Sequence, residues 1–442
     1  MIRRHLFYVL VVLLLVGLVV SACAQQAAPT PTPKPEQPKE QPTKAPEPTK
    51  EPTPTPVPKV KITFWEQENE EVDAFLDELV NAFMEKNPNI TVERVHYGNE
   101  ELRDQFQAAS LAGAAPELVR VPNDFAGPFS ALGIIARATD VFDQSFLDGY
   151  ISEALNATRV KGEIWGVPDN YGNHLMLLYN KSLVSAPPKD TDELIKMAKE
   201  LTQGDIQGFA YNLNEPYWLA PWLGAFGTWP LDENDQPTFD NEGTVAALQF
   251  VQDLKFKYKV VPEECDYACA DTLFKEGKAA IIINGDWSLG GYAEALGDNL
   301  GVDVIPKVTA TGKYPTPMTG GKYWMVSKAV LDNPAKVEAV KTFVAYMASP
   351  EVQKQWIEKF KRLPSLKALK DDPAIQQDPI LQGSFKQLLL GRPMPAAPEM
   401  RCAWDAMRPN LEGVMAGSLT PEEAAKAMQE AADQCVAELG KQ

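Results

Sequence analysis

The sequence is poor in histidine, in cysteine and in positive charge, and each shortage argues against a class of function. Its 442 residues include 3 histidines and 5 cysteines, and no histidine lies near a cysteine in sequence, which argues against a zinc site built from the two. The formal net charge is -18, so binding to the phosphate backbone of nucleic acid is not expected. We therefore expect no metal, no cofactor and no nucleic-acid partner.

The N-terminal segment is typical of an exported protein. Arg3 and Arg4 precede an apolar run from Leu6 to Val20, which is short for a stable membrane span, and small residues lead from there to Cys23. This pattern resembles a bacterial lipoprotein signal. We expect residues 1–22 to be a signal peptide and Cys23 to carry the lipid at the extracytoplasmic face of the cell membrane, with a retained single-span anchor as the alternative.

The lipid-anchored segment 23–58 is dominated by Pro, Thr, Lys, Glu and Gln and has almost no apolar side chains. Burial of apolar surface cannot offset the entropy of ordering such a segment, which predicts a disordered tether. In an extended polyproline-like geometry, at about 3.1 Å per residue, it can hold a domain roughly 100 Å from the membrane. A Pro-rich recognition motif is the alternative.

The remaining cysteines, Cys265, Cys269, Cys402 and Cys435, form an even set in a protein that is expected outside the cytoplasm, which favours disulfides. Proximity in sequence suggests a Cys265–Cys269 pair and a Cys402–Cys435 pair. Apolar residues at three- and four-residue steps place Cys435 on the inward face of a predicted helix over 421–439, from which it can reach Cys402.

Strand and helix patterns alternate at the start of the folded part. Strand patterns at 60–65, 90–95 and 117–121 are separated by helical patterns at 72–84 and 100–112. This order predicts a βαβαβ unit with a parallel sheet and helices on its faces. Further elements are expected at 244–257, 279–283, 323–326, 335–347, 350–360, 380–390, 402–414 and 421–439.

Polar and aromatic residues follow the ends of the predicted strands. Ligands collect beyond the carboxyl ends of parallel strands, with solvated loop polarity as the alternative for each residue there. The candidate contacts in these loops are Glu66, Gln67, Glu68 and Asn69 after the first strand, and Asn123 and Asp124 after the third. The apolar strand over 279–283 is expected to be buried on both faces and places Trp287 just past its end.

The stretch 209–229, FAYNLNEPYWLAPWLGAFGTW, combines a carboxylate with several aromatic rings. Glu215 stands beside Tyr217 where Pro216 can begin a helix. A sugar needs this combination, because its apolar C–H faces stack on flat rings while its hydroxyls bind carboxylates, amides and guanidinium groups. Ordinary core packing is the alternative, and we favour it for Trp218, Trp222 and Trp229.

Three motifs in this order carry a resemblance to a known family: NLNEPYW at 212–218, FKEGKAAIIINGDW at 274–287, and the turn from Met394 that leads to Trp404. The sequence resembles the periplasmic-type solute-binding proteins of ABC importers, and within them the maltose/maltodextrin-binding proteins, over nearly all of residues 60–439. The resemblance implies a two-lobed α/β fold of the class II type. Each lobe would be a mostly parallel sheet flanked by helices, with a hinge between the lobes and sugar bound in the cleft.

The resemblance places the N-terminal lobe at 59–172 plus 322–374 and the C-terminal lobe at 173–321 plus 375–442. It implies a monomer that binds a neutral oligosaccharide and delivers it to the permease subunits of an ABC importer. It also implies that the protein is not an enzyme.

Six residues match ligand contacts of that family: Glu215, Arg408 and Asp124 for sugar hydroxyls, and Tyr217, Trp287 and Trp404 for stacking on sugar faces. The chain departs from the pattern in the first lobe and at the hinge. Val121 stands where maltodextrin binders carry tryptophan, Asn173 where they carry glutamate, and Asn69 with Glu70 where they carry an aspartate-lysine pair. We retain Asn69 and Asn173 as candidate contacts, and the departures bear on sugar linkage, chain length and affinity.

A receptor for another neutral sugar, such as trehalose, is the alternative. A surface glycoside hydrolase is a remote alternative, because Glu215, Asp124 and Asp286 fall near the proposed cleft and two carboxylates suffice for that chemistry. An anionic ligand would need a basic cleft, and Arg408 is the only basic residue that the sequence places there.

Overall fold

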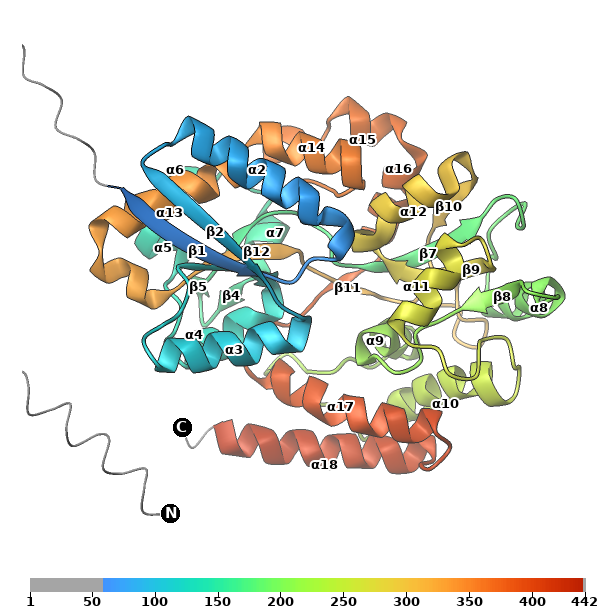
Figure 1. Ribbon diagram of the computed structural model, residues 1–442. Helices are drawn as coiled ribbons and strands as arrows, with labels where there is room; N and C mark the ends of the chain where they lie inside the picture. The colour runs from blue at the N-terminus through green and yellow to red at the C-terminus, as the bar shows by residue number, and fades with distance from the viewer. Residues whose placement is uncertain (1–58, 440–442) are drawn as a thin grey trace, which may run out of the picture. The chain divides into compact units, whose positions relative to one another are not determined.

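Two main β-sheets organise the part of the chain that the computed structural model describes, residues 59–439 (Figure 1). The predicted signal peptide, the tether and the lipidation site Cys23 lie outside these residues. Within them, no helix is both long enough and apolar enough to cross a membrane.

The first sheet begins with the predicted βαβαβ unit, which is confirmed. Strand β1 (Val60–Glu66) pairs in parallel with β2 (Ile90–His96) on one side and with β3 (Leu118–Pro122) on the other. Helices α2 (Asp73–Lys86) and α3 (Asn99–Leu111) make the two connections. The carboxyl ends of β1 and β3 therefore reach the same edge of the sheet.

Two later strands complete the first sheet in the order β2-β1-β3-β12-β6. Strand β12 (Lys322–Val326) pairs with β3 and with β6 (Val167–Pro168), antiparallel in both cases. The buried side chains of α2 and α13 (Pro334–Met347) form one core with this sheet, whereas α3 and α4 (Ala126–Ala131) contribute to a second core. The sheet is thus covered by helices, as an α/β lobe requires.

The second sheet has the order β10-β7-β9-β8. Its strands are β7 (Leu175–Asn180), β8 (Gln207–Ala210), β9 (Ala279–Gly285) and β10 (Leu300–Asp303). Every residue of β9 is buried, which confirms the expectation of a central strand covered on both faces. We call the parts built around the first and second sheets the first and second lobe.

The structure has the expected two-lobed α/β fold, with one correction: the sheets are mixed rather than mostly parallel. Strand β7 is antiparallel to β9 and to β10, and only β8 pairs with β9 in parallel. The reason is where the chain crosses between lobes. Strands β7 and β12 follow crossing segments, so they start at the edge where β9 and β3 end and run away from it. The exact lobe boundaries remain a prediction.

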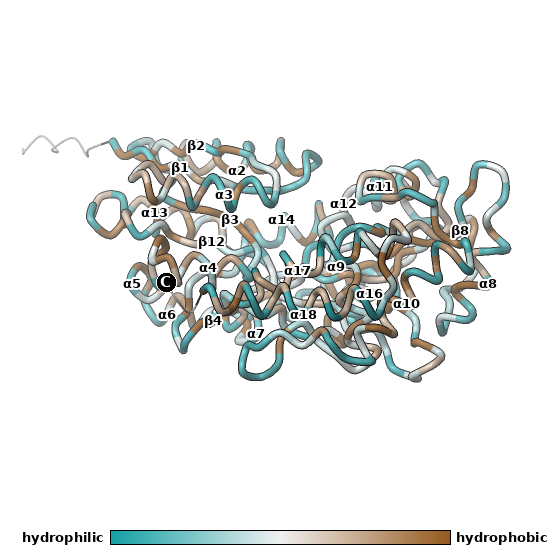
Figure 2. The backbone as a smooth tube through the Cα atoms, turned by 90° about the horizontal axis from the view of Figure 1, so that it is seen from below, coloured by the Kyte–Doolittle hydropathy of each residue, from teal (hydrophilic) through white to brown (hydrophobic). Residues whose placement is uncertain are grey.

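The remaining helices and strands surround these sheets. They are α5 (Ala138–Val141), α6 (Gln144–Leu147), α7 (Ser152–Asn156), α8 (Thr191–Leu201), α9 (Pro216–Phe226), α10 (Glu242–Phe256), α11 (Tyr267–Lys275), α12 (Leu289–Leu296), α14 (Pro350–Phe360), α15 (Pro373–Gln377), α16 (Pro379–Leu388), α17 (Glu399–Met415) and α18 (Pro421–Leu439), with the short strands β4 (Arg159–Val160), β5 (Glu163–Ile164), β11 (Met318–Thr319) and β13 (Arg392–Pro393). Hydrophilic and hydrophobic residues alternate along α18 in Figure 2, as expected for a helix with one buried face.

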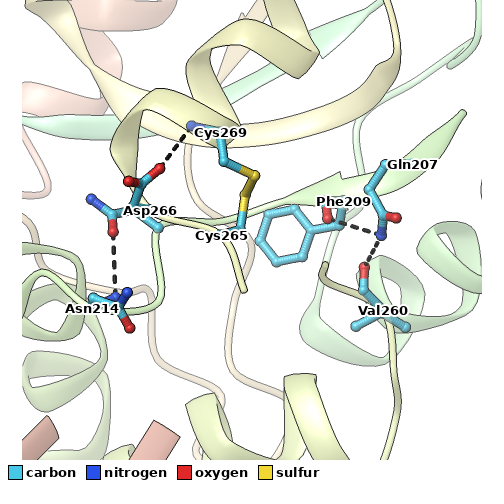
Figure 3. Close-up of a disulfide and its surroundings, with 8 residues drawn as sticks. Gln207, Phe209, Asn214, Val260, Cys265, Asp266 and Cys269 are labelled. Atoms are coloured by element: carbon cyan, nitrogen blue, oxygen red, sulfur yellow. Dashed lines mark hydrogen bonds between the residues drawn. A yellow bond between two sulfur atoms is a disulfide. The ribbon is translucent and has the colours of Figure 1, made fainter. Parts of the chain in front are cut away.

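Both expected disulfides are present. Cys402 of α17 and Cys435 of α18 are joined with their Cα atoms 5.5 Å apart, which ties together two helices that pack along their length. Figure 3 shows the other disulfide, Cys265–Cys269, in which the Asp266 carboxylate also accepts the backbone N–H of Cys269 at 2.9 Å. Because Cys265 O accepts the N–H of Leu213, this disulfide also braces the loop that leads to Glu215.

Candidate functional site

A cleft of about 300 Å³ is lined by residues of both lobes, and all eight predicted ligand contacts line it: Asn69, Asp124, Asn173, Glu215, Tyr217, Trp287, Trp404 and Arg408. A volume of this size is at the lower end of the range for small-molecule sites. Gln67 and Glu68, from the loop after the first strand, line the same cleft. Several polar lining residues were not among the sequence-based candidates: Asn99, Glu100, Arg103, Asn212, Tyr267, Lys322 and Arg401.

Three aromatic rings form one surface on the second-lobe side, which we call the aromatic platform: Tyr217, Trp287 and Trp404. The ring of Tyr217 lies 6.0 Å from that of Trp287 and 6.1 Å from that of Trp404, centroid to centroid. Pro216 begins α9 and puts Tyr217 in its first turn, while Trp287 lies in the 3₁₀ turn η3 (Asp286–Ser288) that follows β9. Rings from three separate parts of the sequence therefore share one opening.

The polar atoms of the platform are bonded to the protein. Trp287 Nε1 donates to Tyr267 Oη at 3.2 Å, and Trp404 Nε1 donates to a carboxylate oxygen of Asp124 at 3.1 Å. The hydroxyl of Tyr217 donates to the backbone oxygen of Asn173. These bonds fix the ring orientations, so the platform offers ring faces rather than polar atoms to a ligand.

One of these bonds, from Tyr217 to Asn173, links the platform to a crossing segment between the lobes. Asn173 lies on the segment between β6 and β7, and its φ of 51° is in the left-handed region. In the paired crossing segment, Gly320 exchanges backbone hydrogen bonds of 2.9 Å with Gly172. A Cβ on Gly172 would lie 2.0 Å from a carboxylate oxygen of Asp286, so any larger residue there would force the buried Asp286 side chain to move.

Glu215 and Arg408 form a two-point ion pair beside the platform. Arg408 Nη1 lies 2.6 Å from one carboxylate oxygen of Glu215, and Nη2 lies 3.2 Å from the other. Arg408 Nη2 also lies 3.5 Å from the carboxylate of Glu100 in α3, and the same carboxylate accepts a hydrogen bond of 2.9 Å from Arg401. The pair therefore holds both groups at fixed positions, and Glu100 extends the contact to the opposite lobe.

Asp124 faces the cleft from the first lobe at the start of the 3₁₀ helix η2 (Asn123–Phe125), just after β3. Burial raises the pKa of Asp124 to about 6, against the hydrogen bond from Trp404, which lowers it. One of its carboxylate oxygens is buried and has no hydrogen-bond partner among the described residues. This oxygen is available to accept a hydrogen bond from a ligand.

Two further contacts join the walls of the cleft. Asn69 Nδ2 donates to Tyr267 Oη at 3.2 Å, so this predicted ligand contact is bonded across the cleft. Beside it, Lys275 of α11 forms a 3.1 Å ion pair with Glu71 of the first lobe. The lobes are therefore in direct contact through side chains in this conformation.

A buried ion network lies at the first-lobe end of the cleft. Arg362 donates to Glu68 at 2.9 Å, and Arg120 donates both to Glu68 and, at 2.9 Å, to Asp169. Burial alone would raise the pKa of Glu68, but the guanidinium groups of Arg362 and Arg120 outweigh it and hold that pKa well below its usual range. The network fixes the loop after β1, which carries Asn69.

The expectation that Arg408 is the only basic residue of the cleft is wrong, since Arg103, Arg401 and Lys322 also line it. Arg103 lies within α3, the helix that follows β2, so the strand-end argument that found Asp124 points to this part of the chain without singling out Arg103. The same argument could not find Lys322, because it begins a strand that runs away from the cleft.

A two-lobed α/β fold with a cleft between its lobes defines the periplasmic-binding-protein-like class. Comparison with known proteins identifies the family within this class. A model of the family described as bacterial extracellular solute-binding protein matches residues 78–383, so the chain belongs to that family. This confirms the resemblance drawn from the sequence motifs.

Individual relatives agree with this assignment. The chain is 36% identical to the maltose/maltodextrin-binding domain from Bdellovibrio bacteriovorus bound to maltotriose, with a TM-score of 0.82 over 85% of this chain and 100% of that one. It is 26% identical over 360 residues to the maltotriose-binding protein of Pyrococcus abyssi, covering 80% of this chain and 77% of that protein. It is also 26% identical over 377 residues to the galactooligosaccharide-binding protein of Bacillus subtilis, covering 82% and 86%.

Proposed function

We propose that this protein binds neutral oligosaccharides of the maltodextrin type in the cleft and delivers them to the permease of an ABC importer. The observation that carries the proposal is the aromatic platform of Tyr217, Trp287 and Trp404 around one opening. Sugar faces stack on such rings, and the polar groups beside them can bind hydroxyls. Relatives named for maltotriose and maltodextrin binding support the assignment.

The charges that line the cleft favour a neutral ligand. The described lining residues include four acids and four bases, namely Glu68, Glu100, Asp124 and Glu215 against Arg103, Lys322, Arg401 and Arg408, so their formal charges cancel. A site for a strongly anionic solute would carry an excess of positive charge. A sugar with uncharged hydroxyls needs no such excess.

Binding would depend on contacts from both lobes. The platform holds the sugar on the second lobe, and closure adds hydroxyl contacts from the first lobe and excludes water. If each ring adds about 1 kcal/mol beyond the area it buries, three rings and a few charge-assisted hydrogen bonds can supply the roughly 8 kcal/mol that micromolar affinity requires.

The experiment that tests the proposal is a calorimetric titration of the purified chain with maltose, maltotriose, trehalose, cellobiose and sucrose. We expect maltotriose or maltose to bind with micromolar or tighter affinity and cellobiose and sucrose to bind far more weakly. Preferential binding of trehalose would favour the alternative of a receptor for another neutral sugar. Absence of binding to every sugar would contradict the proposal.

Asp124 should make sugar binding depend on pH. Its ionised carboxylate can accept a hydrogen bond from a sugar hydroxyl while it also accepts one from Trp404 Nε1. Protonation near pH 6 removes one acceptor, so we expect affinity for maltotriose to fall severalfold between pH 7 and pH 5. Asp124→Asn, which cannot titrate, should bind more weakly at pH 7 and lose this dependence; an unchanged pH profile in the variant would show that another group is responsible.

A surface glycoside hydrolase is the remote alternative, and the observation that favours it is the raised pKa of Asp124, which is a property of a general acid. Against it, Glu215 is already paired with the guanidinium of Arg408, and Asp286 is buried against Gly172 and does not line the cleft. Incubation with maltotriose followed by product analysis distinguishes the two. We expect unchanged sugar, and released glucose or maltose would support the hydrolase.

We also propose that the chain is a monomer, anchored through lipid on Cys23, with the lobe boundaries given by the sequence. Relatives of Streptococcus pneumoniae that are named solute-binding lipoproteins support the anchor. Mass spectrometry of the mature N-terminus tests it: a diacylglyceryl group on Cys23 is expected, and an unprocessed Met1 would contradict it.

A further inference from the structure

Lys322 occupies a fixed position at the edge of the cleft. It is the first residue of β12, opposite Pro122 in the register with β3. Its backbone N–H donates to Asn170 Oδ1 at 2.8 Å, and its carbonyl oxygen accepts the N–H of Asp169 at 2.8 Å. The backbone is therefore held at both polar groups, and the partly buried side chain lines the cleft.

The ammonium group of Lys322 is not used by the protein. Each arginine that lines the cleft has a carboxylate partner: Arg103 and Arg401 pair with Glu100, and Arg408 pairs with Glu215. By contrast, no carboxylate of the described residues lies within 4.0 Å of Lys322 Nζ. An ammonium group carries three donors, so this position offers hydrogen bonds that no described side chain accepts.

The carboxylate of Glu68 already accepts hydrogen bonds from two arginines. Glu68 is the acidic residue with the largest electrostatic effect on Lys322, but both of its oxygens accept guanidinium groups, from Arg120 and Arg362. Withdrawal of Lys322 into the ion network would bring it toward these two cations. The favourable direction for its donors is therefore the cleft.

We propose that Lys322 is a ligand contact, which donates hydrogen bonds from Nζ to hydroxyl or ring oxygens of the bound oligosaccharide on the side opposite the aromatic platform. This proposal rests on the proposed function. The polar atoms of the platform are bonded to the protein, so the platform contacts the apolar faces of sugar rings. All of the sugars in the titration described above have such faces. A donor carried by a held backbone position on the other wall discriminates between sugars by where their oxygens lie, so Lys322 contributes to specificity.

The loss of the Lys322 proton at high pH should change the affinity for sugar, which a purely structural role of this residue would not do. Burial lowers the pKa of Lys322 to about 8, with Glu68 opposing this shift and Arg120 adding to it. The ammonium form is thus dominant at pH 7 and is lost as the pH rises through 8. The charged groups that act on this side chain are Glu66, Glu68, Arg120, Arg362 and, across the cleft edge, Asp124.

The test is a calorimetric titration of the full chain with maltotriose at pH 7 and pH 9. For the wild type, we expect affinity to fall severalfold from pH 7 to pH 9. Lys322→Met should bind about tenfold more weakly at pH 7 and show no further fall. Lys322→Arg, which stays charged at pH 9, should keep affinity within severalfold of the wild type and also lose the fall. Lys328→Met, an exposed lysine just beyond the far end of β12, is the matched control and should behave as the wild type.

Two results would overturn the assignment of Lys322 while leaving the proposed function intact. One is a Lys322→Met variant with wild-type affinity and pH profile. The other, decisive if that variant does not fold, is a Lys322→Arg variant that keeps the wild-type fall between pH 7 and pH 9. Failure of the wild type to bind maltotriose or any other sugar of the panel would overturn both proposals together.

Discussion

Replacement of Trp287 by alanine is expected to weaken maltotriose binding about thirtyfold. Trp287 is a partly exposed ring of the platform, in the 3₁₀ turn that follows the central strand β9 and 6.0 Å from the ring of Tyr217. Truncation of a central aromatic anchor costs about 2 kcal/mol, which corresponds to this factor at 1.4 kcal/mol per tenfold. Calorimetric titration at pH 7 measures the effect directly.

The matched control for this variant is Trp165→Ala. Trp165 is also a partly exposed tryptophan, but it does not line the cleft and donates to the backbone oxygen of Val160 at 3.3 Å. Its loss should lower stability without changing affinity. A Trp287→Ala protein that folds and binds maltotriose as tightly as the wild type would show that the platform is not the sugar site.

Replacement of Arg120 by methionine is expected to lower the free energy of unfolding by about 3 kcal/mol. The Arg120 side chain is fully buried and donates to Glu68 and Asp169, which are themselves buried. Its removal leaves Asp169 without its guanidinium partner in a medium where an unpaired charge is costly. Urea denaturation followed by circular dichroism measures the loss as a lower midpoint at unchanged slope.

Arg137→Met is the control for charge removal at the surface. Its side chain is 46% exposed and pairs with Asp140 at 2.7 Å, and exposed pairs of this kind contribute at most about 1 kcal/mol. If Arg120→Met were no more destabilising than Arg137→Met, the buried ion network would not hold the first-lobe end of the cleft together.

The site residues that could be predicted from the sequence lie at the ends of elements with a simple apolar period. The order of β1, α2, β2, α3 and β3 was predictable because each element has a clear apolar period, and the strand-end rule then placed Asn69 and Asp124 at the cleft. Trp287 followed in the same way from the unbroken apolar run of β9. Local patterns thus identified the site residues that lie just past the end of a single strand.

The contacts that sequence reasoning missed depend on how distant segments meet. Arg401 lines the cleft because α17 lies across from α3, and Glu100 then pairs with it, which no local pattern encodes. Lys322 was missed because its strand starts at the cleft rather than ending there, the same reversal that makes the sheets mixed. Crossing segments set strand direction, and their course is a property of the whole fold.

The most direct test of the account is a crystal structure of the protein with maltotriose bound. We predict that the sugar rings of the trisaccharide stack on Tyr217, Trp287 and Trp404, with sugar carbon atoms within about 4 Å of these aromatic faces. We also predict that Asp124 on the other lobe contacts a sugar hydroxyl. A trisaccharide bound at another surface, with these three rings untouched, would contradict the account.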